Sequence, residues 1–260
     1  MPGSLASLRF DELTDPEIAS RLEQRALVLV PCGSTEQHGP HLPTSTDFLA
    51  SLAICDLVAA ELGGLVLPGM QFGVTPIHMG FAGTVSLSAA TFEQVLYEMV
   101  ASLSSHGVRE VAFVNWHEGN IASLGNLGSR LTQELGMNVV LAHACYVAEE
   151  LFGEQLGGLT HGGAIEGAAV LGARPELAHY ERLDRSASSP GERPADHARR
   201  GRAFQSVLKD IREISDTGWY GSASEVSRDE GSALIKGVAE VVTRELGDRF
   251  ARLAAMRPSS

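Results

Sequence analysis

Carboxylate and imidazole side chains are concentrated in one stretch of the chain, residues 33–47 (GSTEQHGPHLPTSTD), which supplies Glu36, His38, His41 and Asp47. Glu36 and His38 are two residues apart, and in an extended segment such positions point to the same side. Asp47 follows a Pro-containing loop and can either cap a helix or bridge two metal ions. Each residue alone also fits an ordinary loop role. Together they favour a metal site, because a cluster of buried, unpaired carboxylates is costly without cations.

Two further polar groups occur later in the chain, at residues 115–120 (NWHEGN) and 161–166 (HGGAIE). They contribute His117, Glu118, His161 and Glu166. Glycines in the second group let the backbone approach a centre closely, and His161 can exchange protons near neutral pH. Mixed nitrogen and oxygen ligands favour Zn, Mn or Fe over Ca or a thiolate-bound metal.

Apolar runs of strand length alternate with longer amphipathic segments, which predicts an α/β fold with a mostly parallel sheet and one domain over residues 1–260. Strands are predicted at residues 26–30, 65–67, 110–115 and 138–146. Helices are predicted at residues 47–62, 91–106, 120–135, 161–171 and 229–253, the second opened by a capping box of Thr91 and Gln94.

The polar groups at residues 33–47 and 115–120 follow predicted strands directly. In open α/β sheets, ligands bind outside the carboxyl ends of the strands, so we expect the two groups to meet there. The loop at residues 71–88 contains His78 and is longer than the ~12–15 residues beyond which loops are usually functional. The polar, Pro-containing segment 185–200 is expected at the surface.

Composition excludes several classes of function. Twenty basic and 32 acidic residues give a net charge of −12, which disfavours nucleic acid as a partner. Three scattered cysteines exclude a disulfide framework and a CxxC zinc site, and favour a reducing cytoplasm. No apolar run approaches the ~20 residues that span a bilayer, and the N-terminus lacks the pattern of a signal peptide. We therefore expect a cytoplasmic protein that does not bind membranes.

Ordered motifs over most of the chain resemble those of the creatininase (creatinine amidohydrolase) family. STEQHGPHLP followed by TD is similar to the first metal motif of the family, and FGVTPIHMGFAGTVSL resembles its FGxSxEHxxFPGTxSL segment. NWHEGN resembles NGHGGN, HGGAIEGAAVL resembles HAGxxETSxxL, and Thr217-Gly218 with Glu230-Gly231 is similar to the C-terminal TG and EG positions. The resemblance implies a three-layer α/β/α sandwich and a homo-oligomer, often a hexamer.

The resemblance also implies a centre of two divalent ions, Zn or Mn or both, with Fe as an option, bridged by Asp47. The implied ligands are Glu36, His38, Asp47 and His117. Creatininase itself has an acidic ligand two residues after the His of its NGHYEN motif. Here that position is Gly119, and the acid is Glu118, one residue earlier. The fifth ligand is then Glu118 or Glu166, and we favour Glu166, whose counterpart is acidic across much of the family.

The expected activity is hydrolysis of a C–N bond in a small amide, with cyclic amides favoured, by metal-activated water. The expected catalytic residues are Glu118 and His161, and His161 would protonate the departing nitrogen. His78 matches a loop His of the family and is expected to contact the substrate. Trp116 replaces the Gly that usually precedes the metal His, so it is also predicted to shape the substrate pocket.

Three alternatives remain open at this point. A formamide deformylase would need a phosphate-binding patch, and the sequence contains no phosphate loop of the Walker or dinucleotide type. A peptidase that trims a precursor peptide would need an open cleft. A non-catalytic metal-binding homologue is suggested by the displaced acid at Glu118 and by Trp116. Metal analysis and a hydrolysis screen distinguish the last of these from an enzyme.

Overall fold

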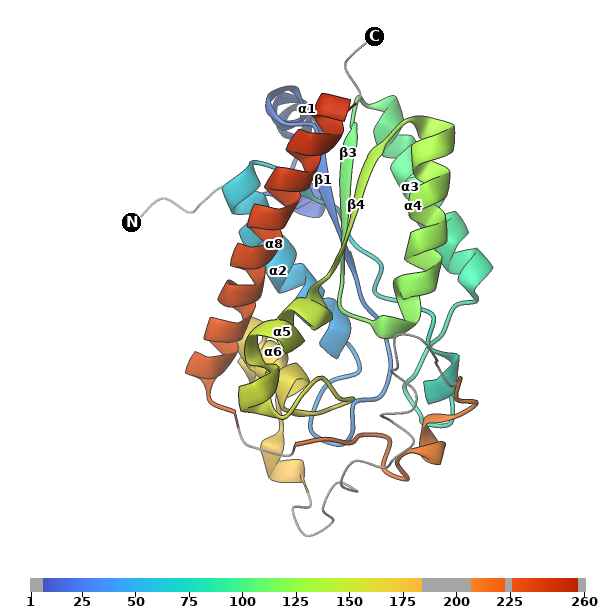
Figure 1. Ribbon diagram of the computed structural model, residues 1–260, viewed down its shortest axis with the longest axis vertical. Coiled ribbons are helices and arrows are strands. Elements are labelled where there is room, and N and C mark those ends of the chain that lie inside the picture. The colour runs from blue at the N-terminus through green and yellow to red at the C-terminus, as the bar shows by residue number, and fades with distance from the viewer. Residues whose placement is uncertain (1–6, 184–206, 223–225, 257–260) are drawn as a thin grey trace.

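The computed structural model describes residues 7–183, 207–222 and 226–256, so the predicted surface segment 185–200 lies outside the described residues. A four-stranded sheet with the order β2-β1-β3-β4 forms its centre (Figure 1). Its strands are β1 (Leu27–Cys32), β2 (Leu65–Val66), β3 (Glu110–Asn115) and β4 (Asn138–His143). All neighbouring strands pair in parallel, which requires crossover connections and places helices on both faces.

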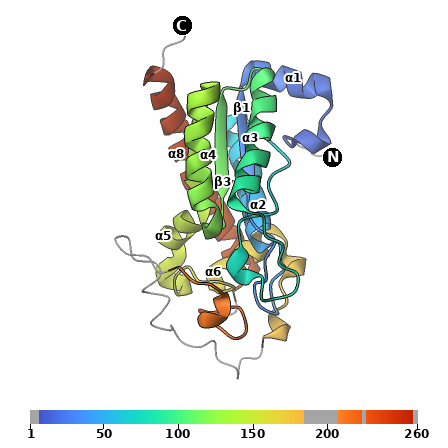
Figure 2. The ribbon, with the colours of Figure 1, turned by 90° about the vertical axis from the view of Figure 1, so that its right-hand side faces the viewer.

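Two pairs of helices cover the sheet (Figures 1 and 2). One face carries α3 (Ala89–Ser105) and α4 (Ile121–Leu135), and the other carries α2 (Thr46–Leu62) and α8 (Arg228–Met256). Alternating strand side chains enter the two layers: Val30 and Phe113 pack toward α3 and α4, whereas Leu29 and Val114 pack toward α2 and α8. The expected three-layer α/β/α sandwich is confirmed.

The remaining helices lie at the two ends of the sheet. In Figure 1, α5 (Ala144–Leu156) and α6 (Ala164–Ala173) lie near the carboxyl ends of the strands, and α1 (Asp15–Gln24) lies at the opposite end. Short 3₁₀ turns are formed by Phe10–Glu12, Pro76–His78, Glu118–Asn120, Pro175–Leu177, Tyr180–Arg182 and Ile211–Glu213.

The Glu230-Gly231 pair joins the start of α8 to α6. The Ser227 backbone N–H donates to Glu230 Oε2 at 2.8 Å, and the Glu230 N–H donates back to Ser227 Oγ at 3.2 Å, which caps the helix. A Cβ at Gly231 would lie 2.7 Å from the carbonyl oxygen of Ala168 and 2.7 Å from the backbone nitrogen of Gly172. Glycine is therefore required for α8 to approach α6 this closely.

Several predicted boundaries are shifted by one to three residues, and three of the shifts have a local cause. The last strand ends at His143 rather than Tyr146, because α5 begins at Ala144. Helix α3 begins after Ser88, whose Oγ accepts from the Thr91 backbone N–H at 3.2 Å, so Thr91 and Gln94 do not form the predicted capping box. Helix α6 begins at Ala164 rather than His161, because a turn precedes it.

Helix α2 is tied to the carboxyl ends of the two central strands by one buried hydroxyl. Ser51 Oγ donates to the carbonyl oxygen of Val114 at 2.6 Å and accepts from the backbone N–H of Cys32 at 3.0 Å. These bonds hold the ends of β3 and β1, after which the polar segments 115–120 and 33–47 begin.

Among the described residues, no helix combines the length and apolar character needed to cross a bilayer.

Candidate metal centre

The side chains that were predicted to bind metal converge beyond the carboxyl ends of β1 and β3. Glu36 and His38 follow β1, and His117 follows β3. Asp47 and Glu166 lie in the first turns of α2 and α6. Each of these five residues is at most 7% exposed. The β1 loop reaches the start of α2 because position 33 is glycine: a Cβ on Gly33 would lie 2.3 Å from the backbone nitrogen of Phe48.

One group of possible ligands consists of Glu36, Asp47 and His117. His117 Nδ1 lies 3.4 Å from Glu36 Oε1 and 3.0 Å from Asp47 Oδ2. The other ring nitrogen, Nε2, lies 3.2 Å from the carbonyl oxygen of Val74, to which it can only donate. The ring therefore directs Nδ1 at the two carboxylates. A metal-binding His commonly donates its second N–H to a backbone carbonyl in this way.

A second group consists of His38, Asp47 and Glu166. His38 Nε2 lies 3.2 Å from Asp47 Oδ1 and 3.6 Å from Glu166 Oε2. Its Nδ1 lies 3.0 Å from the carbonyl oxygen of Glu36, so this ring is also oriented by a bond to a backbone carbonyl. Glu166 is positioned by the Gly162 backbone N–H, which donates to Glu166 Oε2 at 2.5 Å.

Asp47 belongs to both groups. Its Oδ1 faces His38 Nε2, whereas its Oδ2 faces His117 Nδ1 and accepts a bond from Ser34 Oγ at 2.9 Å. In each group the possible ligand atoms lie within 4.8 Å of one another. A carboxylate whose two oxygens face two different imidazole nitrogens has the geometry needed to bridge two ions.

Three buried carboxylates, those of Glu36, Asp47 and Glu166, lie at the centre. Within the described residues, every ion pair that they form is with a histidine. Burial by itself lowers the pKa of His38, but the carboxylates of Glu166, Asp47 and Glu36 together raise it to about 10. Burial also opposes the charge of His117, yet the carboxylates of Glu36 and Asp47 raise the pKa of His117 well above its ordinary value.

The carboxylates respond in two ways. Burial opposes the charge of Glu36 and Asp47, but the neighbouring histidines lower the pKa of both carboxyl groups. Burial and the charge of Asp47 instead raise the pKa of Glu166 to about 8, against the opposing effect of His38. Without metal, protons on histidines neutralise much of this charge. Divalent cations can replace these protons, and the nitrogen and oxygen donors suit Zn, Mn or Fe.

Two further histidines stack beside the cluster. The ring centroids of His78 and His161 are 4.1 Å apart, and His161 lies 4.3 Å from the ring of His38. His161 Nδ1 is 3.6 Å from Glu36 Oε1, and Glu36, His38 and His161 form a third group of possible ligands. Burial is the main cause that lowers the pKa of both His78 and His161, and neighbouring histidines add to it.

Glu118 lies outside these ligand groups, and its Oε1 accepts a bond from the hydroxyl of Tyr146 at 3.0 Å. The structure thus brings Glu166, not Glu118, to His38 and Asp47. The neighbouring Gly119 has no room for a side chain, because a Cβ there would lie 2.2 Å from the carbonyl oxygen of Val74. An acidic ligand at position 119 is therefore sterically excluded by this loop path.

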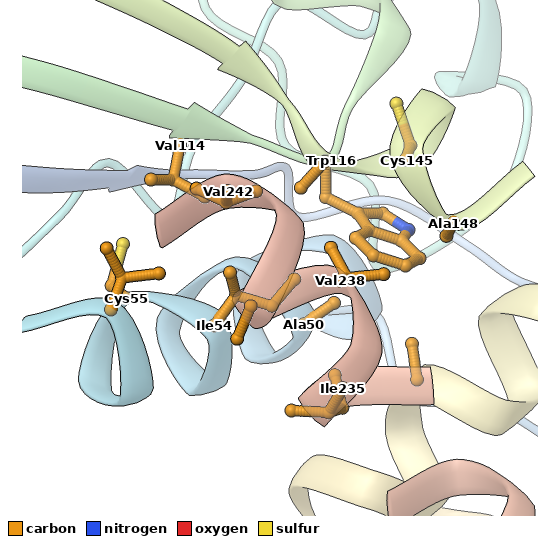
Figure 3. Close-up of a cluster of buried hydrophobic side chains, with 14 of the residues drawn as sticks. Ala50, Ile54, Cys55, Val114, Trp116, Cys145, Ala148, Ile235, Val238 and Val242 are labelled. Atoms are coloured by element: carbon orange, nitrogen blue, oxygen red, sulfur yellow. The ribbon is translucent and has the colours of Figure 1, made fainter. Parts of the chain in front are cut away.

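Trp116 is packed in the hydrophobic core rather than at the cluster (Figure 3). It is 2% exposed, and Figure 3 shows its indole beside Cys145, Ala148 and Val238, between α5 and α8. The indole thus packs among apolar side chains of the core, whereas His78 and His161 stack beside the ligand groups.

His41 is also buried, but it supports the turn before α6 instead of joining the cluster. Its Nε2 lies 2.9 Å from the carbonyl oxygen of Gly162, and burial lowers its pKa to about 4. Gly162 itself is confined between Trp219 and the backbone of His38. The bond from His41 therefore helps to position Gly162, whose N–H donates to Glu166.

Several uncharged residues that complete the site were missed by sequence reasoning. Thr75 Oγ1 donates to Glu36 Oε2. Asn120 joins two loops: its Nδ2 donates to the carbonyl oxygen of Gly33 at 2.9 Å, and its Oδ1 accepts from the backbone N–H of Val74 at 3.0 Å. These residues lie inside or beside the motifs already noted, but an uncharged polar residue has no distinctive spacing that reveals such a role.

Comparison with known proteins identifies the family. The family model described as Creatininase: Creatinine amidohydrolase matches residues 11–246. The creatinine amidohydrolase of Pseudomonas putida is 29% identical over 90% of this chain and 95% of its own length. A mycofactocin precursor peptide peptidase of Mycobacterium ulcerans is 30% identical over 89% of this chain and 86% of its own. Its Mycolicibacterium smegmatis counterpart is 42% identical, but over only 38% of this chain and 42% of that relative.

Solved structures agree with this result. A creatininase mutant complexed with creatine has a TM-score of 0.78 and 26% identity, and the match covers 94% of this chain and 99% of that one. A creatininase mutant described as Zn-Zn type has a TM-score of 0.77 and 25% identity, covering 94% and 98%. A creatininase with Mn has a TM-score of 0.75 and 25% identity, covering 94% and 99%. Because the family model spans most of the sequence and the fold agrees over nearly the whole chain, this protein belongs to the creatininase family.

Proposed function

We propose that this chain is a hydrolase that holds two divalent ions and cleaves a C–N bond of a small amide, with cyclic amides favoured. The observation that carries the proposal is the shared carboxylate of Asp47, which faces His38 with one oxygen and His117 with the other. Glu36 would complete the first ligand group and Glu166 the second. Zn and Mn are the proposed ions, with Fe as an option, since solved creatininases are described with Zn or Mn.

Two divalent ions in such a centre would lower the pKa of a water molecule toward neutrality and polarise an amide carbonyl. The protein supplies orientation and proton transfer. Backbone carbonyls fix the rings of His38 and His117, so that one nitrogen of each faces the carboxylates. His161 directs Nδ1 at the same centre. In the proposed reaction, this nitrogen accepts a proton from the attacking water and returns it to the departing nitrogen of the substrate.

A precursor-trimming peptidase is the second candidate function. It is favoured by the mycofactocin precursor peptide peptidases among the relatives, one of which matches 89% of this chain. The ligand groups serve either substrate equally well, because both reactions direct water at an amide carbonyl. The side chains that face the centre are all at most 8% exposed, and this burial favours a small molecule over a peptide as the substrate.

Metal analysis followed by a hydrolysis screen tests the proposal. Purified protein is expected to contain two divalent ions per chain. Adding Zn, Mn or Fe back to metal-depleted protein is expected to restore hydrolysis of at least one lactam, cyclic urea, formamide or short peptide. A site with one ion or none, together with no hydrolysis under any of these conditions, would instead favour a non-catalytic homologue. Sedimentation of the same protein tests the expected homohexamer.

A matched pair of variants tests the fifth ligand. Glu166→Gln is expected to lose one of the two ions, because the amide removes the charge that faces His38 Nε2. Glu118→Gln is expected to keep both ions, because that carboxylate lies against the Tyr146 hydroxyl. Elemental analysis of both variants gives the ion count. The assignment is reversed if Glu118→Gln loses an ion while Glu166→Gln retains two.

A further inference from the structure

The side-chain amide of Gln37 lies between the backbone and two histidine rings at the metal centre, and the residue is 7% exposed. Its Oε1 accepts from the backbone N–H of Gly39 at 3.0 Å, and its Nε2 donates to the carbonyl oxygen of Gly218 at 2.6 Å. A backbone N–H can only donate and a carbonyl can only accept. The orientation of the amide is therefore fixed by two backbone groups and does not depend on either ring.

This orientation determines the tautomer of His78. Gln37 Nε2 lies 3.0 Å from His78 Nδ1, and an amide nitrogen can only donate, so Nδ1 must be the acceptor. A neutral His78 then carries its proton on Nε2. That nitrogen lies 3.7 Å from Glu36 Oε1, on the side of the metal centre. His78 thus presents an N–H donor to the site.

The backbone of the same residue determines the opposite tautomer in His161. His161 Nε2 lies 2.6 Å from the carbonyl oxygen of Gln37, so it must carry the proton. The 3.1 Å approach of Gln37 Nε2 to this nitrogen is then a contact between two N–H groups rather than a hydrogen bond. A neutral His161 keeps its lone pair on Nδ1, which lies 3.6 Å from Glu36 Oε1. One carboxylate oxygen therefore faces a donor from His78 and an acceptor from His161.

We propose that Gln37 is a positioning residue that fixes His78 as the hydrogen-bond donor and His161 as the acceptor of the site. The catalytic consequence rests on the proposed function: the donor would stabilise the substrate carbonyl oxygen, and the acceptor would take the proton of the attacking water. Gly218 supports this arrangement, because its φ is +83° and a Cβ there would lie 2.4 Å from Gln37 Oε1. Only glycine lets this carbonyl approach the amide closely.

Nuclear magnetic resonance of the zinc-loaded protein tests the tautomers directly. ¹⁵N shifts of the imidazoles, assigned with a His78→Gln variant, are expected to show a protonated Nε2 and a bare Nδ1 in His78. Gln37→Glu has nearly the same shape but replaces the amide donor with an acceptor. In this variant we expect His78 Nδ1 to gain a proton and bond to the new carboxylate. A protonated Nδ1 in the unaltered protein would overturn the proposal, whatever the variant does.

Kinetics provide the second readout. Gln37→Glu is expected to lower kcat by about 10- to 100-fold, at or below the low end of the effect of general acid–base groups because Gln37 acts through His78, while KM changes less than about threefold. Gln133→Glu is the matched control, since Gln133 is exposed on α4 and the change in charge is identical. It should alter neither the tautomers nor kcat. An unchanged His78 tautomer in folded Gln37→Glu refutes the role of Gln37. Correct tautomers without hydrolysis of any amide refute only the proposed function.

Discussion

Replacing Asp47 by asparagine is expected to remove both metal ions and to lower hydrolysis by more than about 100-fold. Residues that only orient metal ligands already cost 10–100-fold when mutated, and Asp47 would be a ligand to both ions. Its two oxygens lie 3.2 Å from His38 Nε2 and 3.0 Å from His117 Nδ1. The amide of asparagine keeps the shape but loses the charge, and its nitrogen presents hydrogens where a cation needs a lone pair.

Elemental analysis and the hydrolysis assay on the same preparation check this result. The matched control is Asp229→Asn, which makes the same substitution at an exposed position in the first turn of α8 and should retain two ions and full activity. Circular dichroism establishes whether each variant is folded. A folded Asp47→Asn protein that retains two ions would show that Asp47 does not bridge them, and the two-ion centre would have to be abandoned.

The parallel sheet was predictable because its central strands are buried on both faces. Strand β3 has the predicted bounds, and helix α4 ends where predicted, with Gly136 in a left-handed conformation of φ +65°. The end of β4 was not predictable from apolar character, which continues from Val139 to Val147. His143 pairs with Asn115, the last residue of β3. The residues beyond it have no strand to pair with and can enter a helix.

Helix α1 was missed although its signal is local. Asp15 and Pro16 open the helix, and Glu17 Oε2 accepts from the Thr14 backbone N–H at 2.7 Å, as in a capping box. Only two of the ten residues from Asp15 to Gln24 are strongly apolar, Ile18 and Leu22, so periodicity alone did not reveal it. A helix with so few apolar residues is indicated by its capping residues rather than by the spacing of apolar side chains.

The acidic and histidine residues of the site were predictable because few other arrangements explain such side chains just beyond buried strands. The role of Gln37 was not predictable, since its partner Gly218 is 181 residues away.

The buried position of Trp116 could have been predicted from the alternation of side chains along the strand. Trp116 is two residues after Val114, and both side chains enter the core layer of α2 and α8. The departure of Trp116 from the family motif suggested a pocket, whereas the periodicity of the strand indicated a core position.

Metal affinity is expected to rise steeply with pH between pH 6 and pH 8, because the ligands of the metal-free protein hold protons that the ions must displace. Carboxylates raise the pKa of His38 to about 10 against the effect of burial, and burial raises the pKa of Glu166 to about 8. Both groups are therefore protonated at pH 7, and the raised pKa of His117 adds a third proton. Each displaced proton strengthens binding by about tenfold per pH unit.

Calorimetric titration of Zn into metal-free protein, in buffers with different enthalpies of ionisation, measures the number of protons released. We expect at least two protons per pair of ions at pH 7. Above pH 8 the contribution of Glu166 should end, because its carboxyl group is then already ionised. Glu166→Gln, which is expected to bind one ion only, should release fewer protons at pH 7 and lose the step near pH 8. Release of less than one proton, with an affinity that is flat from pH 6 to pH 8, would mean that the ligands hold no protons in the metal-free protein, and the charge balance inferred from the raised pKa values of His38 and Glu166 would be wrong.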